Sequence, residues 1–206
     1  MIMKANIEDI VFGFILAPLA PLAGLLGFWW ASYALLPEKW ISVCALSGLA
    51  LGILADILVL KRMIAHAPQY GMVFWITVFL FYTVGVFGFF MGMPVFNAAL
   101  GIPAGFIVGG KLARRMADKS QIRSAGIRTS LFTTIILTGI CATSATLALN
   151  EATLPSQLEG MLGLPFPVTW DMVWGIILVG GSGLLVINWL LTSFTVRYTC
   201  RFLSIS

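Results

Sequence analysis

Apolar residues occur in six long runs that are separated by short polar segments. The runs approach or exceed the about 20 residues that a helix needs to cross a bilayer. They are too long for the strands of about 10 residues that form membrane barrels. Because backbone in lipid must satisfy its own hydrogen bonds, runs of this length favour helices. We therefore predict transmembrane helices over residues 10–36, 41–60, 70–92, 95–111, 129–149 and 172–194.

Composition supports the same class of protein. The chain has 206 residues, of which 60% are hydrophobic and 10% are charged, whereas soluble domains carry about 25% charged residues. The predicted fold class is an all-α polytopic membrane protein, a bundle of six transmembrane helices that forms one domain over residues 1–206. The first run shows no cleavage site and is too long for a signal peptide, so we expect a retained helix. Pro18 and Pro21 predict a kink in it.

Lysines and arginines predict the orientation of the chain. Cytoplasmic loops of membrane proteins carry an excess of these residues. With six spans, Lys39 alone lies on one side, and 11 of the 12 Lys and Arg residues lie on the other. We therefore expect both termini in the cytoplasm, and we expect the plasma (inner) membrane of a prokaryote.

The outer segment 151–171 is too apolar for a flexible linker. Ser156 and Glu159 have the spacing of a capping box, and Gly163 is a helix stop signal. We predict a short interfacial helix in this outer loop, before the last span. Two interpretations remain open: the helix anchors the chain at the membrane surface, or it covers an outward cavity.

Small residues recur at helical spacing in three of the six runs, and three glycines cluster in the last run. This spacing lets two helix backbones approach closely, which drives helix association in lipid. Either the helices of the bundle pack on these faces, or the faces bind a membrane partner subunit. At residues 180–183 close packing is favoured over a local bend. The predicted packing residues are Ala23, Gly27, Ala31, Gly48, Gly52, Gly101, Gly105, Gly109, Gly180, Gly181 and Gly183.

Polar residues inside the runs are candidates for a ligand or ion pathway. A carboxylate at the centre of a bilayer costs at least about 2.5–3.5 kcal/mol. Asp56 lies within a span. Its carboxylate either forms a structural salt bridge with Lys61 or Arg62, or serves as a proton or cation site. The hydroxyls of 129–149 either bond within and between helices or line a cavity. The predicted pathway residues are Asp56, Asn97, Thr134, Thr138, Ser144 and Asn188.

The segment 111–128 carries six cations against Asp118 alone. Each such cation contributes about 1 kcal/mol of attraction to an anionic membrane surface. We predict contact with anionic lipid, or alternatively with a cytoplasmic partner, through Lys111, Arg114, Arg115, Lys119, Arg123 and Arg128. Nucleic acid is not an expected partner, because the segment is short and lacks interleaved aromatic residues.

Residues 180–183 spell G-x-S-G, which resembles the serine motif of rhomboid intramembrane proteases. In that family a histidine on another helix activates the serine. Here the sole histidine, His66, falls in a loop, while Ser182 lies about 15 Å from either membrane surface, so the two side chains are out of hydrogen-bonding reach. One histidine and three scattered cysteines, Cys44, Cys141 and Cys200, do not provide a metal site. We expect no enzyme activity, no metal and no cofactor.

In outline, with about 200 residues and six spans, the chain resembles the substrate-binding subunits (S components) of energy-coupling-factor vitamin transporters. The resemblance implies that a small-residue face of the first helix docks a transmembrane partner. It covers architecture only. The leading hypothesis is a transport-type protein that binds or passes a small solute, with a partner subunit. The alternative is a non-transporting accessory or assembly protein that packs against other membrane subunits or lipids.

Overall fold

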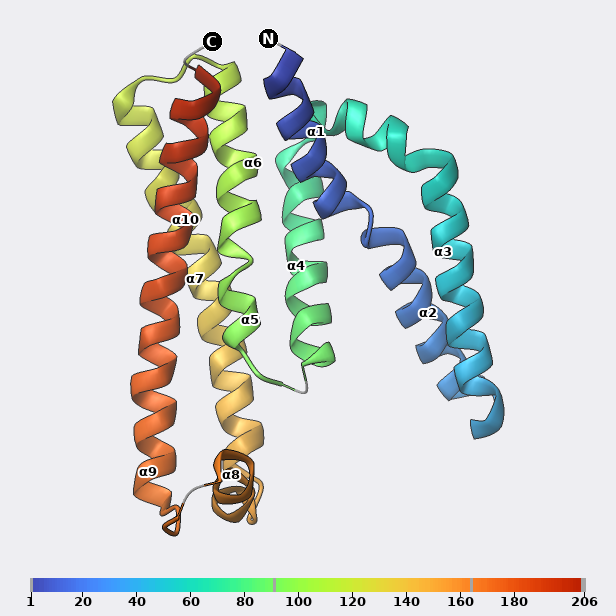
Figure 1. The fold of residues 1–206 in the computed structure, drawn as a ribbon, viewed down its shortest axis with the longest axis vertical. Coiled ribbons are helices and arrows are strands. Elements are labelled where there is room, and N and C mark those ends of the chain that lie inside the picture. Colours follow the sequence, from blue (N-terminus) through green and yellow to red (C-terminus); the bar gives the residue numbers. More distant parts are fainter. Residues whose placement is uncertain (1, 91, 164, 205–206) are drawn as a thin grey trace. The chain divides into compact units, whose positions relative to one another are not determined.

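A computed structural model describes residues 2–90, 92–163 and 165–204 of the chain (Figure 1). These residues form an all-α fold. Six helical segments are long and apolar enough to cross a membrane, as the sequence predicts: Ile7–Leu35, Glu38–Gln69, Met72–Phe89, Val95–Arg114, Lys119–Leu149 and Trp170–Ser204. Residue 91, which falls in the predicted third span, lies outside the described residues. The sides of the membrane on which the two termini lie remain a prediction.

Contacts divide the chain into two compact units, with the boundary between Phe74 and Trp75. Unit 1 precedes this boundary and unit 2 follows it. Each unit is described by itself, and the single domain expected over residues 1–206 stays a prediction.

Unit 1 contains α1 (Ile2–Leu16), α2 (Leu19–Leu35), α3 (Glu38–His66) and the short 3₁₀ helix η1 (Ala67–Gln69). The first apolar run is split between α1 and α2, which confirms the predicted kink. The interruption falls at Ala17 and Pro18, and a proline cannot donate a backbone hydrogen bond to the preceding turn. Helix α2 resumes when Leu22 N donates to the Pro18 carbonyl at 3.0 Å.

Helices α2 and α3 pack through glycine. Gly24 lies against the Gly48 carbonyl, and a methyl group added at Gly52 would lie 2.6 Å from Pro21 Cα. The two backbones therefore approach closely, and the Phe28 side chain of α2 packs beside Gly48. The packing predicted for Gly48 and Gly52 is present here, and their partners are Gly24 and the Ala20–Pro21 segment of α2.

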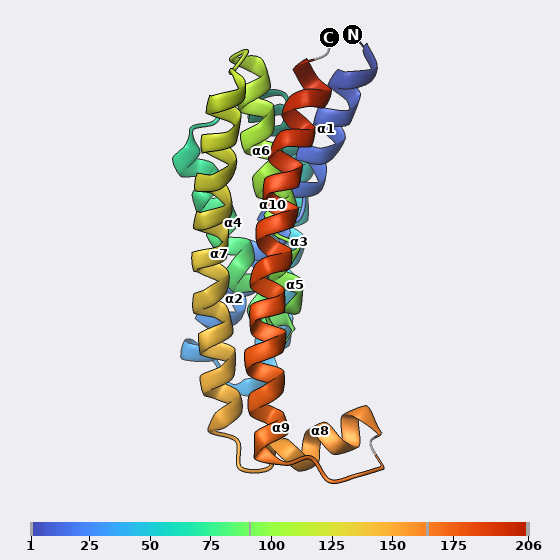
Figure 2. The same cartoon turned by 90° about the vertical axis from the view of Figure 1, so that its left-hand side faces the viewer.

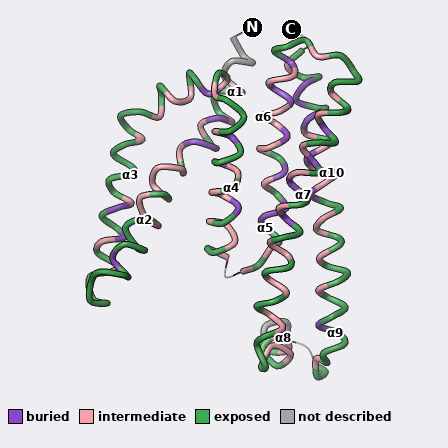
Figure 3. Tube along the Cα trace, turned by 180° about the vertical axis from the view of Figure 1, so that it is seen from behind, coloured by how far each residue is buried: buried purple, intermediate pink, exposed green. Residues whose placement is uncertain are grey.

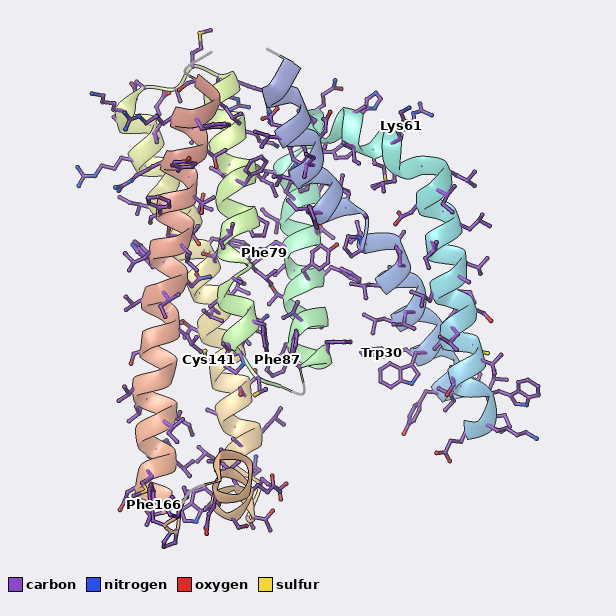
Figure 4. All side chains as sticks on the ribbon, viewed as in Figure 1. Trp30, Lys61, Phe79, Phe87, Cys141 and Phe166 are labelled. Carbon is purple, nitrogen blue, oxygen red and sulfur yellow. The ribbon has the colours of Figure 1, made fainter. Side chains whose placement is uncertain are left out.

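Unit 2 holds most of α4 (Met72–Phe89), then α5 (Val95–Ala98), α6 (Gly101–Arg114), α7 (Lys119–Leu149), α8 (Leu154–Leu162), α9 (Trp170–Gly175), the π-helix η2 (Ile176–Gly180) and α10 (Gly181–Ser204). Helices α6, α7 and α10 pack against one another. Figure 2 shows α7 and α10 running beside each other along their length. Phe79 of α4, labelled in Figure 4, contacts Phe132 of α7, with 5.6 Å between ring centroids.

The predicted outer helix is present as α8, but its start differs from the prediction. Thr153 occupies the N-cap position, and Pro155 lies in the first turn, a position that favours helix starts. Ser156 lies inside the helix, where its hydroxyl donates to the Thr153 carbonyl at 2.8 Å. Gly163 ends the helix with φ of 60°, a left-handed conformation that glycine adopts at little cost. The Ser156–Glu159 capping box was therefore wrong, and the Gly163 stop is confirmed.

Candidate functional site

The fourth span is broken between α5 and α6. Leu100 N donates to the Asn97 carbonyl at 3.1 Å, and Ile102 N donates to the Ala99 carbonyl at 3.0 Å. Both bonds span three residues instead of the four of a regular α-helix. In a regular helix the Ile102 N–H would serve the Ala98 carbonyl. The tightened turn leaves that carbonyl to be satisfied from outside the span.

Asn188 of α10 supplies the missing donor. Its Nδ2 donates to the Ala98 carbonyl at 3.1 Å. Its Oδ1 accepts from the Thr133 hydroxyl at 3.0 Å and from the Thr134 hydroxyl at 3.3 Å. The side chain is only 1% exposed. One buried amide of α10 therefore bonds both to the break in the fourth span and to α7.

Further hydroxyl groups extend this network between α7 and α10. The Thr133 and Thr192 hydroxyls lie 3.2 Å apart, and the Ser130 and Ser193 hydroxyls lie 2.7 Å apart. Ser130, Thr133 and Thr192 are all buried. We call these residues, with Ala98 and Asn188, the polar junction. Buried polar groups in an apolar surrounding are stable when they are bonded in this way.

Asn97 lies at the start of the same break. Its Nδ2 donates to the Thr83 carbonyl of α4 at 2.8 Å. Its Oδ1 is buried and has no hydrogen-bond partner among the described residues. Because an unsatisfied buried acceptor carries its full desolvation cost, this oxygen is a candidate contact for a bound group.

The glycines of α6 allow α10 to approach the junction. A methyl group at Gly101 would collide with the Thr192 hydroxyl, and one at Gly105 would lie 2.9 Å from the Thr192 carbonyl. One at Gly109 would lie 2.7 Å from the Val196 carbonyl. The predicted face of Gly101, Gly105 and Gly109 therefore packs within the molecule, against α10.

The C-terminal half of α7 behaves differently from the half that contacts the junction. The Thr138 hydroxyl donates to the Thr134 carbonyl at 2.8 Å, and the Thr143 hydroxyl donates to the Gly139 carbonyl at 2.9 Å. Both bonds stay within the helix, and both threonines are exposed, whereas Ser144 is half-buried. Figure 3 shows mainly exposed and intermediate positions along this end of α7 and along η2. Thr134 reaches the junction, and neither Thr138 nor Ser144 is brought to it.

Asp56 lies in unit 1, on α3, where it is half-buried. Among the described residues it makes no ion pair, so the salt bridge considered with Lys61 (labelled in Figure 4) or Arg62 is not formed. Its role as a proton or cation site stays a prediction.

Two small-residue surfaces are open in the part of the chain that the structure describes. Ala23, Gly27 and Ala31 are exposed, and a methyl group at Gly27 would meet no atom within 4 Å. The face of α2 that packs on α3 is instead the neighbouring one that contains Gly24. Two faces of α2 carry small residues, and the contact with α3 uses only one of them. Partner docking by the face of Ala23, Gly27 and Ala31 stays a prediction.

The glycines near the G-x-S-G sequence are open as well. Methyl groups at Gly180, Gly181 and Gly183 would meet no atom within 4 Å, so the close packing favoured there is not seen among the described residues. These glycines follow directly on η2, and π-helical turns disturb the regular helix locally. The Ser182 hydroxyl donates to the Leu178 carbonyl. No group of three or more His, Cys, Asp or Glu that could hold a metal ion occurs within residues 2–90, 92–163 and 165–204.

The basic segment folds mainly into the ends of α6 and α7. Lys111 and Arg114 lie in the last turn of α6, and Arg115 follows as its C-cap. Lys119 begins α7, which also carries Arg123 and Arg128. Asp118 caps α7: its Oδ1 accepts from Gln121 N at 2.7 Å, and Gln121 Oε1 accepts from Asp118 N at 3.3 Å.

Comparisons with protein-family models, curated proteins and solved structures find no match to this chain. The class of protein therefore rests on the fold itself. Six long apolar helices indicate a polytopic integral membrane protein in a lipid bilayer.

Proposed function

We propose that the protein is a transport-type membrane protein that binds a small solute beside the polar junction of unit 2. The observation that supports this proposal is the broken fourth span, with the unpartnered oxygen of Asn97 at its start. Transporter sites commonly form at discontinuous helices near the bilayer midplane. Polar groups inside a membrane mark such pathways.

The chemistry of the junction suggests which solutes fit. Asn188 and the surrounding hydroxyls bond to one another, so they hold the break in place. Asn97 Oδ1 remains as an acceptor, which favours a solute that carries a hydroxyl, amide or ammonium donor. The proposal includes both termini in the cytoplasm, the plasma membrane of a prokaryote, and a partner subunit like those that S components use.

Thermal-shift measurements on the purified full chain test this function. The panel would contain vitamins, nucleosides and metal cations, and the variants would be Asn97→Leu and Thr138→Val. Thr138 is the matched control, since its hydroxyl bonds only within α7. We expect a donor-bearing solute to stabilise the native chain and Thr138→Val, and to have no effect on Asn97→Leu. If no compound of the panel raises the unfolding temperature of the native chain, solute binding is contradicted.

The open small-residue surfaces favour a second candidate, an accessory protein that holds other membrane subunits. Gly27 on α2 and Gly180 on η2 meet no atom within 4 Å of an added methyl group, and close helix approach in lipid uses such positions. Stable co-purification of other membrane subunits, lost in Gly27→Leu or Gly180→Leu, would support this candidate. Purification of the chain alone from mild detergent would contradict it.

A further inference from the structure

The packing of α7 against α10 fixes which side chains face each other at one end of unit 2. The Ser130 and Ser193 hydroxyls bond at 2.7 Å. Further toward that end, a methyl group at Gly126 would lie 3.8 Å from Val196 Cγ1. Because the helices run antiparallel, the start of α7, with Arg123, lies beside the last part of α10, with Arg197. Figure 1 shows the start of α7 and the end of α10 at the same end of unit 2.

An open pocket of about 520 Å³ lies at this level, lined by Lys119, Ile122, Arg123 and Arg197. Three cations from two helices therefore share one pocket. Among the described residues none of the three forms an ion pair with a carboxylate. Like charges held together in this way repel one another unless an anion neutralises them.

The nearest acidic residue in the sequence does not supply that anion. Asp118 Oδ1 accepts from Gln121 N at 2.7 Å and from the Ser120 hydroxyl at 2.9 Å. Its carboxylate therefore caps the first turn of α7 and is not an ion-pair partner of the pocket.

We propose that this pocket binds the phosphate group of an anionic phospholipid. Arginine offers paired N–H donors that match phosphate oxygens, and lysine adds a point charge. The pocket lies at the ends of two membrane-spanning helices, where lipid headgroups lie and where cations attract anionic lipid. Ile122 adds an apolar contact for the carbon atoms next to the phosphate.

The test uses the full chain in phosphatidylcholine nanodiscs, to which phosphatidylglycerol or phosphatidic acid is added. Native mass spectrometry measures lipid retention, and thermal unfolding measures stabilisation. Removing one pocket cation in Arg197→Gln should weaken anionic lipid binding about fivefold. Arg201→Gln is the matched control, because it removes one exposed cation of the same helix that does not line the pocket; it should change binding by less than about twofold.

A further variant and a second ligand complete the experiment. Arg197→Lys should keep part of the binding, because it retains the charge and loses the paired donors. If Arg197→Gln does not fold, Lys119→Gln, at the exposed start of α7, replaces it. Inorganic phosphate forms a separate arm of the experiment. If phosphate stabilises the native chain but not the pocket variant, and anionic lipid neither binds to nor stabilises the native chain, the ligand is a soluble phosphate. That result overturns the lipid assignment. Equal losses in Arg197→Gln and Arg201→Gln, or no binding in either arm, overturn the site.

Discussion

Two helix pairs in this protein meet across glycines, and they differ in what faces those glycines. Between α2 and α3, Gly24 and Gly52 lie against the backbone of Gly48 and of Ala20. Between α6 and α10, Gly101 and Gly105 lie against both the backbone and the hydroxyl-bearing side chains of α10, such as Thr192. The first contact consists of close backbone packing, with one apolar side chain, Phe28, beside Gly48. The second brings polar side chains to the centre of unit 2.

The difference shows that one spacing of small residues can serve two purposes. Close approach alone gives van der Waals contact, which is the main drive for helix association in lipid. At α6 and α10 the same approach also brings Asn188 within 3.1 Å of the Ala98 carbonyl. The glycines of α6 therefore position a hydrogen-bond donor, which those of α2 and α3 do not.

The largest expected effect comes from filling the α6–α10 contact. A methyl group at Gly105 would already lie 2.9 Å from the Thr192 carbonyl and 2.8 Å from Thr195 Cβ. Gly105→Leu should therefore lower the free energy of unfolding by about 3 kcal/mol. Equilibrium unfolding in mixed micelles, followed by circular dichroism, measures it. Gly183→Leu, in open space on α10, is the control, and equal losses in both variants would contradict the packing.

Removing the central amide should have the next largest effect. Asn188→Leu leaves the Ala98 carbonyl without its donor and the Thr133 hydroxyl without one of its acceptors, at an expected loss of about 2 kcal/mol of unfolding free energy. The matched change in unit 1 is Ser47→Ala, because the Ser47 hydroxyl donates only to the Val43 carbonyl of its own helix. The same unfolding assay compares them. A Ser47→Ala loss as large as that of Asn188→Leu would remove the distinction between the two helix pairs.

Two neighbouring glycines of α2 test the packing of unit 1, because one contacts α3 and the other does not. Gly24→Ala places a methyl group 2.9 Å from the Gly48 carbonyl carbon, and we expect a loss of about 1.5 kcal/mol. Gly27→Ala meets open space and should stabilise α2 by up to about 1 kcal/mol, because alanine has the higher helix propensity. Thermal unfolding of both variants measures the effects. A destabilising Gly27→Ala would show that its face is packed in the membrane.

The smallest expected effect concerns the cap that begins α7. The Gln121 backbone N–H and the Ser120 hydroxyl hold the pKa of Asp118 below its ordinary value. Such a carboxyl stabilises the folded state above the ordinary pKa of aspartate, and the stabilisation is lost as the pH falls through the lowered folded-state pKa. Asparagine caps helices without titrating.

The unfolding midpoint of the native chain should therefore exceed that of Asp118→Asn at neutral pH. This difference should shrink as the pH falls into the acidic range. Thermal unfolding of both proteins over a pH series measures it. A difference that stays constant with pH would mean that the Asp118 charge does not contribute to the cap.

The sequence predicted the features that depend on local composition. Six apolar runs became six helical segments, and Pro18 interrupts the first of them. Asn97 and Asn188 were recognised because amides are costly within an apolar run, and both lie at the break in the fourth span.

Features that depend on a neighbouring helix were not predictable in the same way. The spacing of Ala23 and Gly27 is as favourable as that around Gly24, and only the position of α3 determines which face packs. Likewise, Arg197 entered the sequence argument only through its charge. Its place beside Arg123 depends on the register of α10 against α7, which no local pattern encodes.

The broken fourth span also constrains how the chain is made. The Ala98 carbonyl receives its hydrogen bond from a side chain 90 residues later in the sequence. A ribosome releases the fourth span well before the last one, so the Ala98 carbonyl cannot receive this bond until Asn188 has been made. Synthesis of α10 is therefore the step that supplies the donor for the break in the fourth span, and a chain cut short before Asn188 should fold without this bond between the fourth span and α10.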